Sequence, residues 1–371
     1  MHTVRVYNDI RGNGGDRMED LYDYPLYLKL YEQIKETVMQ TPVGANIPPE
    51  RRICEIYGVD RVTVRKALAI LEQEGYITRR QGRGTTVCSH ELQECKMVLF
   101  LLCQGTHGAD RLVEPFYALS IDKLEAKLHK QQMKLLYSRL GKGENPVDLC
   151  RKFDAKAVIL AGNPDESALS YFRHVDLPVV CYNTRINGFS SVMVDNEDAA
   201  QISAKHLLSL GHKRIGVIEV PGYINSEQRC SGYRLEMERA GLTNCLSVAS
   251  GDWTENGGYL AAKELLNALG EPITAIFAAN DSMAIGTLQA AKELGIRVPQ
   301  QLSIIGFDGI QNQPVTVPML TTLKVDIDVM ADALCMLLTQ IIKNESVKGI
   351  HVKVTADFLS RGSTAAAPNQ Q

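Results

Sequence analysis

Residues 97–364 alternate between short apolar runs and longer amphipathic stretches, and this alternation constrains the fold more than any other feature of the 371-residue chain. Short apolar runs bounded by polar residues are typical of strands buried on both faces. Strands that alternate with helices form parallel sheets with helices on both sides. About ten such units are too many for one small sheet, so we predict an α/β fold with two doubly wound parallel-sheet lobes. The predicted strands are 97–103, 134–137, 157–161, 178–182, 215–219, 275–279 and 303–307, and the predicted helices are 117–131, 196–210, 231–240, 259–269 and 281–294.

The segment 59–87, which precedes these units, has a different pattern. Val64, Leu68 and Leu71 recur at helical spacing and give one apolar face, while basic and hydroxyl residues cluster off that face at the N-terminal end. Gly75 is suited to end the helix in a left-handed conformation. Two short strands follow at 76–80 and 85–87, joined by a glycine-rich basic turn, so we predict a helix followed by a two-stranded ribbon.

A helix with a basic ribbon behind it has the dimensions and chemistry of a DNA reader. The major groove is about 12 Å wide and admits one helix, and arginine is the commonest specific reader of guanine. Hydroxyls and helix N-termini bind phosphates, and glycines allow a close approach of the backbone to DNA. The pattern alone fits equally well a short surface helix whose charged end is merely solvated.

The residues flanking this helix resolve that choice, because they carry a resemblance. Pro25-Leu-Tyr, Ile47-Pro-Pro-Glu-Arg, Val59-Asp-Arg-Val-Thr-Val-Arg-Lys-Ala-Leu and Gln81-Gly-Arg-Gly-Thr stand in the order of the winged helix-turn-helix of GntR regulators. The chain resembles that family over residues 25–88. By motif position, the resemblance implies DNA contacts from Arg51, Arg61, Thr63, Arg65, Gln81 and Gly82.

Three positions depart from the GntR pattern. Asp60 and Val62 stand where the family usually has hydroxyl residues, so two donors to phosphate are missing, and Pro49 replaces a serine. Asp60 can still cap the helix, although its charge would face phosphate.

Several polar or aromatic residues lie near the ends of the predicted strands in the second half of the chain. In parallel sheets ligands bind beyond the carboxyl ends of the strands. Amide, carboxylate and guanidinium groups bind sugar hydroxyls, and an indole packs on the apolar face of a sugar. The candidates are Asn183, Arg229, Trp253, Asn280 and Asp308. Taken singly they have ordinary explanations: Asn280 can cap the next helix, Asp308 can form a turn, and the single Trp can belong to the core.

A second resemblance covers residues 97–364. Gly211-His-Lys-Arg-Ile-Gly, Ala279-Asn-Asp-Ser-Met-Ala-Ile-Gly, Ile304-Ile-Gly-Phe-Asp and Phe358-Leu-Ser-Arg-Gly-Ser-Thr look like the effector domain of LacI/GalR regulators, which has a periplasmic-binding-protein-like fold. The resemblance implies an effector site made by the five candidates, with Phe116 and Tyr117 as a wall. A GntR-like unit replaces that family's own DNA-binding headpiece. This combination resembles regulators of the arabinose-repressor type, which implies a pentose effector such as L-arabinose.

Charge and composition fit this organisation. The net charge of −3 averages over unlike parts, because Pro25 to Cys88 contains ten Lys or Arg against seven Asp or Glu. No apolar run approaches the roughly 18 residues that span a bilayer, and the N-terminus has no secretory core. The nine cysteines form no Cys-x-x-Cys pair. We therefore expect a cytoplasmic protein with reduced thiols, no membrane association, no metal and no cofactor.

These observations predict a mobile tail at 1–24, a DNA-binding domain at 25–88, a linker at 89–96, an effector-binding and dimerisation domain at 97–364 and a tail at 365–371. The predicted function is a homodimeric, sugar-controlled repressor of transcription that is not an enzyme. A sugar-dependent activator remains an alternative. A nucleotide-binding enzyme would need a glycine-rich phosphate loop, which Leu102–Gly108 imitates only loosely, and the attached winged helix argues against a transport-type sugar receptor.

Overall fold

The structure is a computed structural model, and it divides into two compact units, Met1–Glu94 and Cys95–Gln371. The residues that it describes are 26–73, 75–80, 84–88, 96–103, 115–175, 177–268, 272–309, 316–343 and 349–368. The predicted N-terminal tail at 1–24 and the predicted linker residues 89–95 lie outside these ranges. Within them, no helix is long and apolar enough to cross a membrane.

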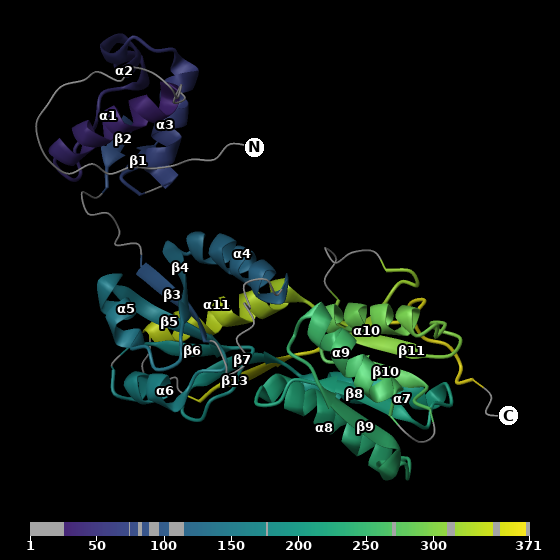
Figure 1. Cartoon of the computed structure of the whole chain (residues 1–371). Helices are drawn as coiled ribbons and strands as arrows, with labels where there is room; N and C mark the ends of the chain where they lie inside the picture. Colours follow the sequence, from purple (N-terminus) through teal and green to yellow (C-terminus); the bar gives the residue numbers. More distant parts are fainter. Residues whose placement is uncertain are drawn as a thin grey trace, which may run out of the picture. The chain divides into compact units, whose positions relative to one another are not determined.

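The first unit is a three-helix domain with a short antiparallel ribbon (Figure 1). Its elements are α1 (Leu26–Gln40), α2 (Glu50–Tyr57), α3 (Arg61–Gln73), β1 (Ile77–Arg80) and β2 (Gly84–Val87). The apolar faces of α1 and α3 form one buried core, in which Ile34 and Val38 join Val64, Leu68 and Leu71. The predicted helix and ribbon are therefore both present, and the ribbon is paired in register from Ile77 with Val87 to Arg80 with Gly84.

The second unit begins with a six-stranded sheet whose strands are all parallel, in the order β13-β7-β6-β5-β3-β4 (Figure 1). The strands are β3 (Lys96–Cys103), β4 (Met133–Leu140), β5 (Ala155–Gly162), β6 (Val179–Tyr182), β7 (Ser190–Val194) and β13 (His351–Val354). The helices are α4 (Pro115–His129), α5 (Pro146–Lys152), α6 (Glu166–Arg173) and α11 (Ile327–Lys343). α4 and α11 pack together against this sheet, and α5 packs against α6.

A second six-stranded sheet has the order β14-β12-β11-β10-β8-β9, and only the edge strand β14 is antiparallel to its neighbour. The strands are β8 (Ile215–Glu219), β9 (Leu246–Ser250), β10 (Ala275–Ala278), β11 (Ser303–Asp308), β12 (Thr321–Val325) and β14 (Ala356–Leu359). The helices are α7 (Asn196–Ser209), α8 (Ile224–Arg239), α9 (Glu255–Leu266) and α10 (Asp281–Glu293), with a 3-10 turn at Thr243–Cys245. α9 and α10 touch at two glycines: a Cβ on Gly286 would lie 1.9 Å from the Glu255 carbonyl oxygen, and one on Gly258 would lie 2.3 Å from the Met283 carbonyl oxygen.

The chain crosses between the two sheets three times, from β7 to α7, from β12 to α11 and from β13 to β14. One continuous apolar cluster includes residues of both sheets, for example Val98, Val217 and Phe307. The predicted two-lobed α/β fold is thus confirmed. Two predicted helix starts were wrong by four residues or more, because α8 begins at Ile224 rather than Ser231 and α9 at Glu255 rather than Tyr259.

The last described residues are anchored to the second lobe. The backbone N–H of Ala367 donates to the Leu210 carbonyl oxygen over 2.8 Å, and the Ala365 carbonyl oxygen lies 3.0 Å from Nε2 of the buried His212. The first four residues of the predicted tail at 365–371 therefore pack on the domain, whereas 369–371 lie outside the described residues.

Candidate functional site

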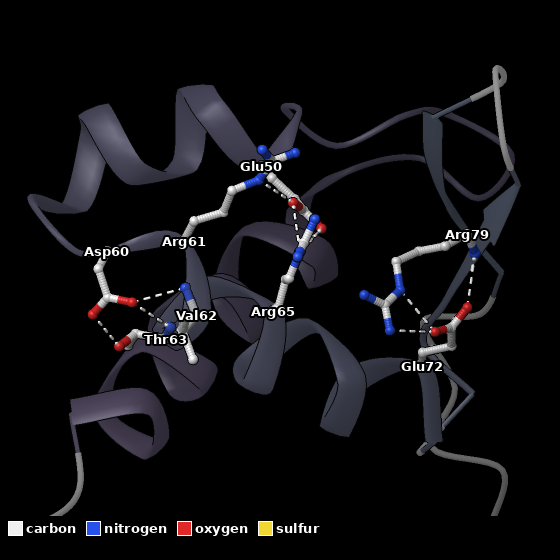
Figure 2. Close-up of polar contacts among 8 residues, drawn as sticks. All are labelled: Glu50, Asp60, Arg61, Val62, Thr63, Arg65, Glu72 and Arg79. Atoms are coloured by element: carbon white, nitrogen blue, oxygen red, sulfur yellow. Dashed lines mark hydrogen bonds and ion pairs between the residues drawn. The ribbon is translucent and has the colours of Figure 1, made fainter.

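Helices α2 and α3 are joined by a tight turn that begins with Gly58. The Gly58 backbone has φ 65°, the left-handed conformation that glycine adopts most readily, and its N–H donates to the Cys54 carbonyl oxygen. Asp60 then caps α3, because its Oδ1 accepts from the N–H groups of Val62 (2.7 Å) and Thr63 (2.9 Å) (Figure 2). Helix, glycine turn and capped second helix together form a helix-turn-helix.

The hydroxyl of Thr63 is bound by this cap. It donates to Asp60 Oδ2 over 2.7 Å, and this bond is the main reason why the pKa of Asp60 lies below its ordinary value. Thr63 was predicted to contact DNA. In the free protein its hydroxyl hydrogen points to Asp60, so the hydroxyl oxygen is left as an acceptor for another group.

Arg61 and Arg65 share one carboxylate. Nε of Arg61 donates to Glu50 Oε2 over 2.9 Å, and Nε of Arg65 donates to the same oxygen over 3.2 Å (Figure 2). Partial burial raises the pKa of Glu50, but the hydrogen bonds from the two arginines outweigh it and the pKa lies below its ordinary value. The two arginine side chains are nonetheless 68% and 58% exposed, so both remain accessible to a ligand.

Arg51 lies on α2, and its side chain is 93% exposed with a long contact of 3.5 Å from Nε to Glu55 Oε1. Val62, the second residue of α3, is exposed as well. Arg51, Arg61 and Arg65 thus place three accessible cations on α2 and the N-terminal half of α3.

The ribbon is fastened to α3 by an ion pair. Glu72, near the end of α3, accepts from Arg79 Nε over 2.7 Å and from the Arg79 backbone N–H over 3.0 Å (Figure 2). On the other side Asn46 pairs with Thr86 of β2 through an isolated bridge. The predicted contacts Gln81 and Gly82 lie outside the described residues.

The second unit contains a cavity of about 370 Å³ between its two lobes. Its lining comes from loops that follow strands of both sheets, the position expected for ligands of parallel sheets. Asn163 follows β5, Asn183 follows β6, and Tyr223 follows β8. Asn163 Nδ2 donates to the Gly222 carbonyl oxygen over 2.8 Å and so spans the cavity from one lobe to the other.

Asn183 is the predicted effector residue whose environment is most unusual. It is only 6% exposed, its backbone is left-handed with φ 51°, and its N–H donates to the Val192 carbonyl oxygen over 2.8 Å. Its side-chain oxygen Oδ1 is buried and has no hydrogen-bond partner among the described residues. A buried acceptor in a cavity wall is satisfied when a ligand or water donates to it.

Tyr117 also lines the cavity, whereas Phe116 lies behind it. The Phe116 ring stacks on Tyr182 with centroids 6.1 Å apart and meets Tyr117 edge to face at 5.3 Å. The Tyr182 hydroxyl donates to Ser120 Oγ over 2.9 Å. The two predicted aromatic residues therefore form a wall two layers deep.

Trp253 and Asn280 support the wall of the second lobe without lining the cavity. The Trp253 ring is buried and meets the lining residue Tyr223 edge to face at 5.6 Å. Asn280 Nδ2 donates to the Trp253 carbonyl oxygen over 2.9 Å, and Asn280 Oδ1 caps α10 by accepting from the Met283 N–H over 2.8 Å. Asn280 therefore caps α10, and its contact with an effector stays a prediction.

Arg229 does not follow a strand, as the sequence suggested, but lies inside α8 and is 2% exposed. Its Nε donates to Asn196 Oδ1 over 2.9 Å, Nη1 donates to the Ala279 carbonyl oxygen, and the guanidinium lies 3.4 Å from the centre of the Phe307 ring. The local error arose because α8 begins seven residues earlier than predicted. Arg229 thereby connects α7, α8 and the end of β10.

Asp308 ends β11 with φ 105°, and it is followed by Gly309 at φ 64°. The Gly309 N–H donates to Asp281 Oδ2 over 2.9 Å, and Thr322 donates to Asp281 Oδ1 over 2.6 Å. Asp308 does not line the described cavity. Of the seven predicted effector residues, the cavity brings together Tyr117 and Asn183.

Sequence reasoning missed several lining residues. They are Asn163, Arg173, Arg185, Tyr223, Asn225 and Glu227. Asn163 was within reach, because it lies two residues after the predicted strand 157–161, where the strand-end rule applies. Arg173 was not, since it lies at the end of α6, where it pairs with Glu166.

The fold and the two sites define a winged helix-turn-helix joined to a two-lobed parallel α/β domain, and comparisons with known proteins agree. Residues 26–87 match the family "Bacterial regulatory proteins, gntR family", and residues 204–364 match "Periplasmic binding protein-like domain". Similar curated proteins are the HTH-type transcriptional repressors PurR of Klebsiella pneumoniae (strain ATCC 700721 / MGH 78578), 30% identical over 223 residues, and of Salmonella paratyphi B, 31% identical over 224. These alignments cover 59% of the chain and 65% of each relative, so the chain spans less than two thirds of their length.

Solved structures show the same two-lobed fold. A LacI transcriptional regulator from a Rhodococcus species has a TM-score of 0.65 at 22% identity, covering 74% of this chain and 100% of that one. A LacI family regulator from Enterococcus faecium with bound ribose has a TM-score of 0.65 at 23% identity, covering 73% and 99%. The chain therefore joins a segment that matches the gntR family model to a two-lobed domain with a periplasmic-binding-protein-like fold.

Proposed function

We propose that this chain is a transcriptional regulator whose binding to operator DNA is controlled by a sugar. The observation that carries the proposal is the presence of two complementary sites in one chain. The exposed arginines Arg61 and Arg65 lie at the start of a capped second helix of a helix-turn-helix, and a cavity with a buried free acceptor lies between two lobes. Its relatives named as transcriptional repressors support repression as the sign of control.

The DNA contacts proposed are those of Arg51, Arg61, Thr63, Arg65, Gln81 and Gly82. The three arginines are exposed cations, the type of group that binds guanine and phosphate. The peptide N–H groups at the start of α3 are partly used by Asp60, so the helix N-terminus itself offers less to phosphate than the arginines do.

The effector proposed is a neutral polyhydroxylated ligand. The amides Asn163, Asn183 and Asn225 offer both donors and acceptors, as sugar hydroxyls require, and a cavity of about 370 Å³ suits a small ligand. Tyr117 and Asn183 would contact it directly. Trp253 and Asn280 would hold Tyr223 in place, and the roles of Phe116, Arg229 and Asp308 in binding are tested by substitution. A pentose such as L-arabinose remains the first candidate, and the ribose-bound relative is in keeping with it.

We further propose that the regulator acts as a homodimer, because two reading helices can then meet half-sites spaced by turns of about 34 Å. Helix α11 exposes two large apolar side chains, Val329 and Met336, that a partner subunit could cover.

The experiment has two arms. Duplexes that bind are selected from a randomised pool, and the complex is then titrated with pentoses, hexoses and disaccharides. Arg61→Ala should weaken binding of the selected duplex by about 1–3 kcal/mol if the side chain reads a base, with sugar binding intact. Arg297→Ala, the same change at an exposed arginine of the second unit, is the control. Failure to enrich any duplex would contradict the proposal, and tighter DNA binding with sugar would make the chain an activator.

A further inference from the structure

One carboxylate at the start of α2 holds two side chains from the helix that follows it. Glu50 is the first residue of α2, and its side chain is 22% exposed. It accepts from Nε of Arg61 at 2.9 Å, while Arg65 Nε lies 3.2 Å from one carboxylate oxygen and 3.4 Å from the other (Figure 2). Because residues four apart lie on one side of a helix, Arg61 and Arg65 point toward the same partner.

This arrangement leaves the ends of both guanidinium groups available. Both arginines bind Glu50 through Nε, and within the described residues the terminal Nη groups of Arg61 and Arg65 have no partner. The Nη groups carry four of the five N–H donors of a guanidinium, and donors of this kind form paired hydrogen bonds to O6 and N7 of guanine. Glu50 therefore restrains each arginine without using the donors that a base would need.

The same carboxylate also reduces the repulsion between the two arginines. Two guanidinium groups four residues apart repel each other, and a single negative charge between them offsets that repulsion. The low pKa of Glu50 keeps it ionised at neutral pH. The negative charge, however, lies on a surface that faces phosphate in the proposed complex, where it opposes binding to any duplex regardless of sequence.

We propose that Glu50 is a positioning residue for sequence reading, because it orders Arg61 and Arg65 before DNA binds. Its charge lowers the affinity for every duplex, while the order that it imposes increases discrimination between sequences. This inference rests on the proposed function, because it requires that α3 reads DNA. Without Glu50 each arginine would have to be ordered at the moment of binding, and ordering two long side chains should lower the preference for the selected duplex on the order of tenfold.

The test compares Glu50→Gln with Glu36→Gln. Glu36 is an exposed residue of α1 in the same domain, and its substitution removes the same charge. Among the described residues, none that is proposed to contact DNA pairs with Glu36. Binding of the full chain to the selected duplex, to each of its single-base variants and to a scrambled duplex is measured by fluorescence anisotropy at several salt concentrations. Thermal unfolding of each variant is recorded alongside, because loss of an acidic residue at a helix N-terminus also affects stability.

For Glu50→Gln we expect equal or tighter binding to the scrambled duplex and a ratio of selected to scrambled affinity about tenfold lower. The base preference should flatten at the same base pairs that Arg61→Ala and Arg65→Ala flatten. Glu36→Gln should leave the ratio unchanged. A change of affinity that is equal for all duplexes, whether upward from lost repulsion or downward from a less stable domain, would overturn the inference, as would an unchanged ratio. A wild-type chain without any sequence preference would instead overturn the proposed function, before any variant is compared.

Discussion

Replacing Arg229 with methionine separates a structural role from a ligand-binding role. The guanidinium is 2% exposed and donates to Asn196 Oδ1 and to the Ala279 carbonyl oxygen while it stacks on Phe307. Methionine fills similar space but leaves both buried acceptors without these donors, at a cost of about 1–3 kcal/mol each. It also removes a desolvated cation–π contact of about 2 kcal/mol. Part of this loss is offset because a charge no longer has to be buried, so we expect the free energy of unfolding to fall by about 3 kcal/mol.

Urea unfolding followed by the fluorescence of Trp253 measures this effect. Trp253 is the only tryptophan in the chain, and it lies in the same lobe as Arg229. Arg234→Met is the matched control, because Arg234 lies on the same helix but is exposed. The urea midpoint of Arg229→Met should fall with an unchanged slope, while the control should unfold like the wild type. If the urea midpoint of Arg229→Met equalled that of the wild type and only its sugar affinity fell, the structural role would be refuted.

Two further predictions concern the cavity and the winged domain. Asn183→Leu should weaken sugar binding by about 1–3 kcal/mol, because it removes the buried acceptor Oδ1, which has no hydrogen-bond partner among the described residues. DNA affinity in the absence of sugar should stay unchanged. Calorimetric titration measures the sugar affinity, and an unaltered value would contradict the prediction. The hydrogen bond from Arg79 holds the pKa of Glu72 below its ordinary value despite partial burial. The ionised Glu72 side chain therefore stabilises the fold at a pH above the pKa of an unfolded glutamate, and this stabilisation is lost as the pH falls through the lower pKa of the folded state. As the pH falls below about 4.5, the unfolding temperature of the winged domain should therefore drop, and the drop should be smaller in Glu72→Gln. Equal drops in the two chains would contradict this.

The parts of the fold that the sequence predicted well are those with local signals. The helix from Arg61 was marked by its apolar spacing and by Asp60 before it, and both are present as predicted. Strand pairings between distant parts of the chain have no comparable local sequence pattern. β13 (His351–Val354) pairs with β7 (Ser190–Val194), about 160 residues away in sequence, and neither strand was predicted. Short strands whose partner is distant have little local pattern to distinguish them from loops.

The candidate site was predicted in part for the same reason. Asn183 was found because it directly follows a recognisable strand. The bonds from Arg61 and Arg65 to Glu50 were not, since they join residues 11 and 15 positions apart on different helices and depend on the angle between α2 and α3. Arg229 was assigned to a strand end because glycine and proline before α8 obscured the start of that helix.

In the proposed function the two sites of this chain are energetically coupled, and sugar affinity measured with and without the selected duplex tests this coupling most directly. If sugar weakens DNA binding by some factor, DNA must weaken sugar binding by the same factor, because binding free energies are linked. We predict a lower sugar affinity for the DNA-bound chain, by the factor found in the reverse titration. Equal sugar affinities for the free and the DNA-bound chain would contradict the account.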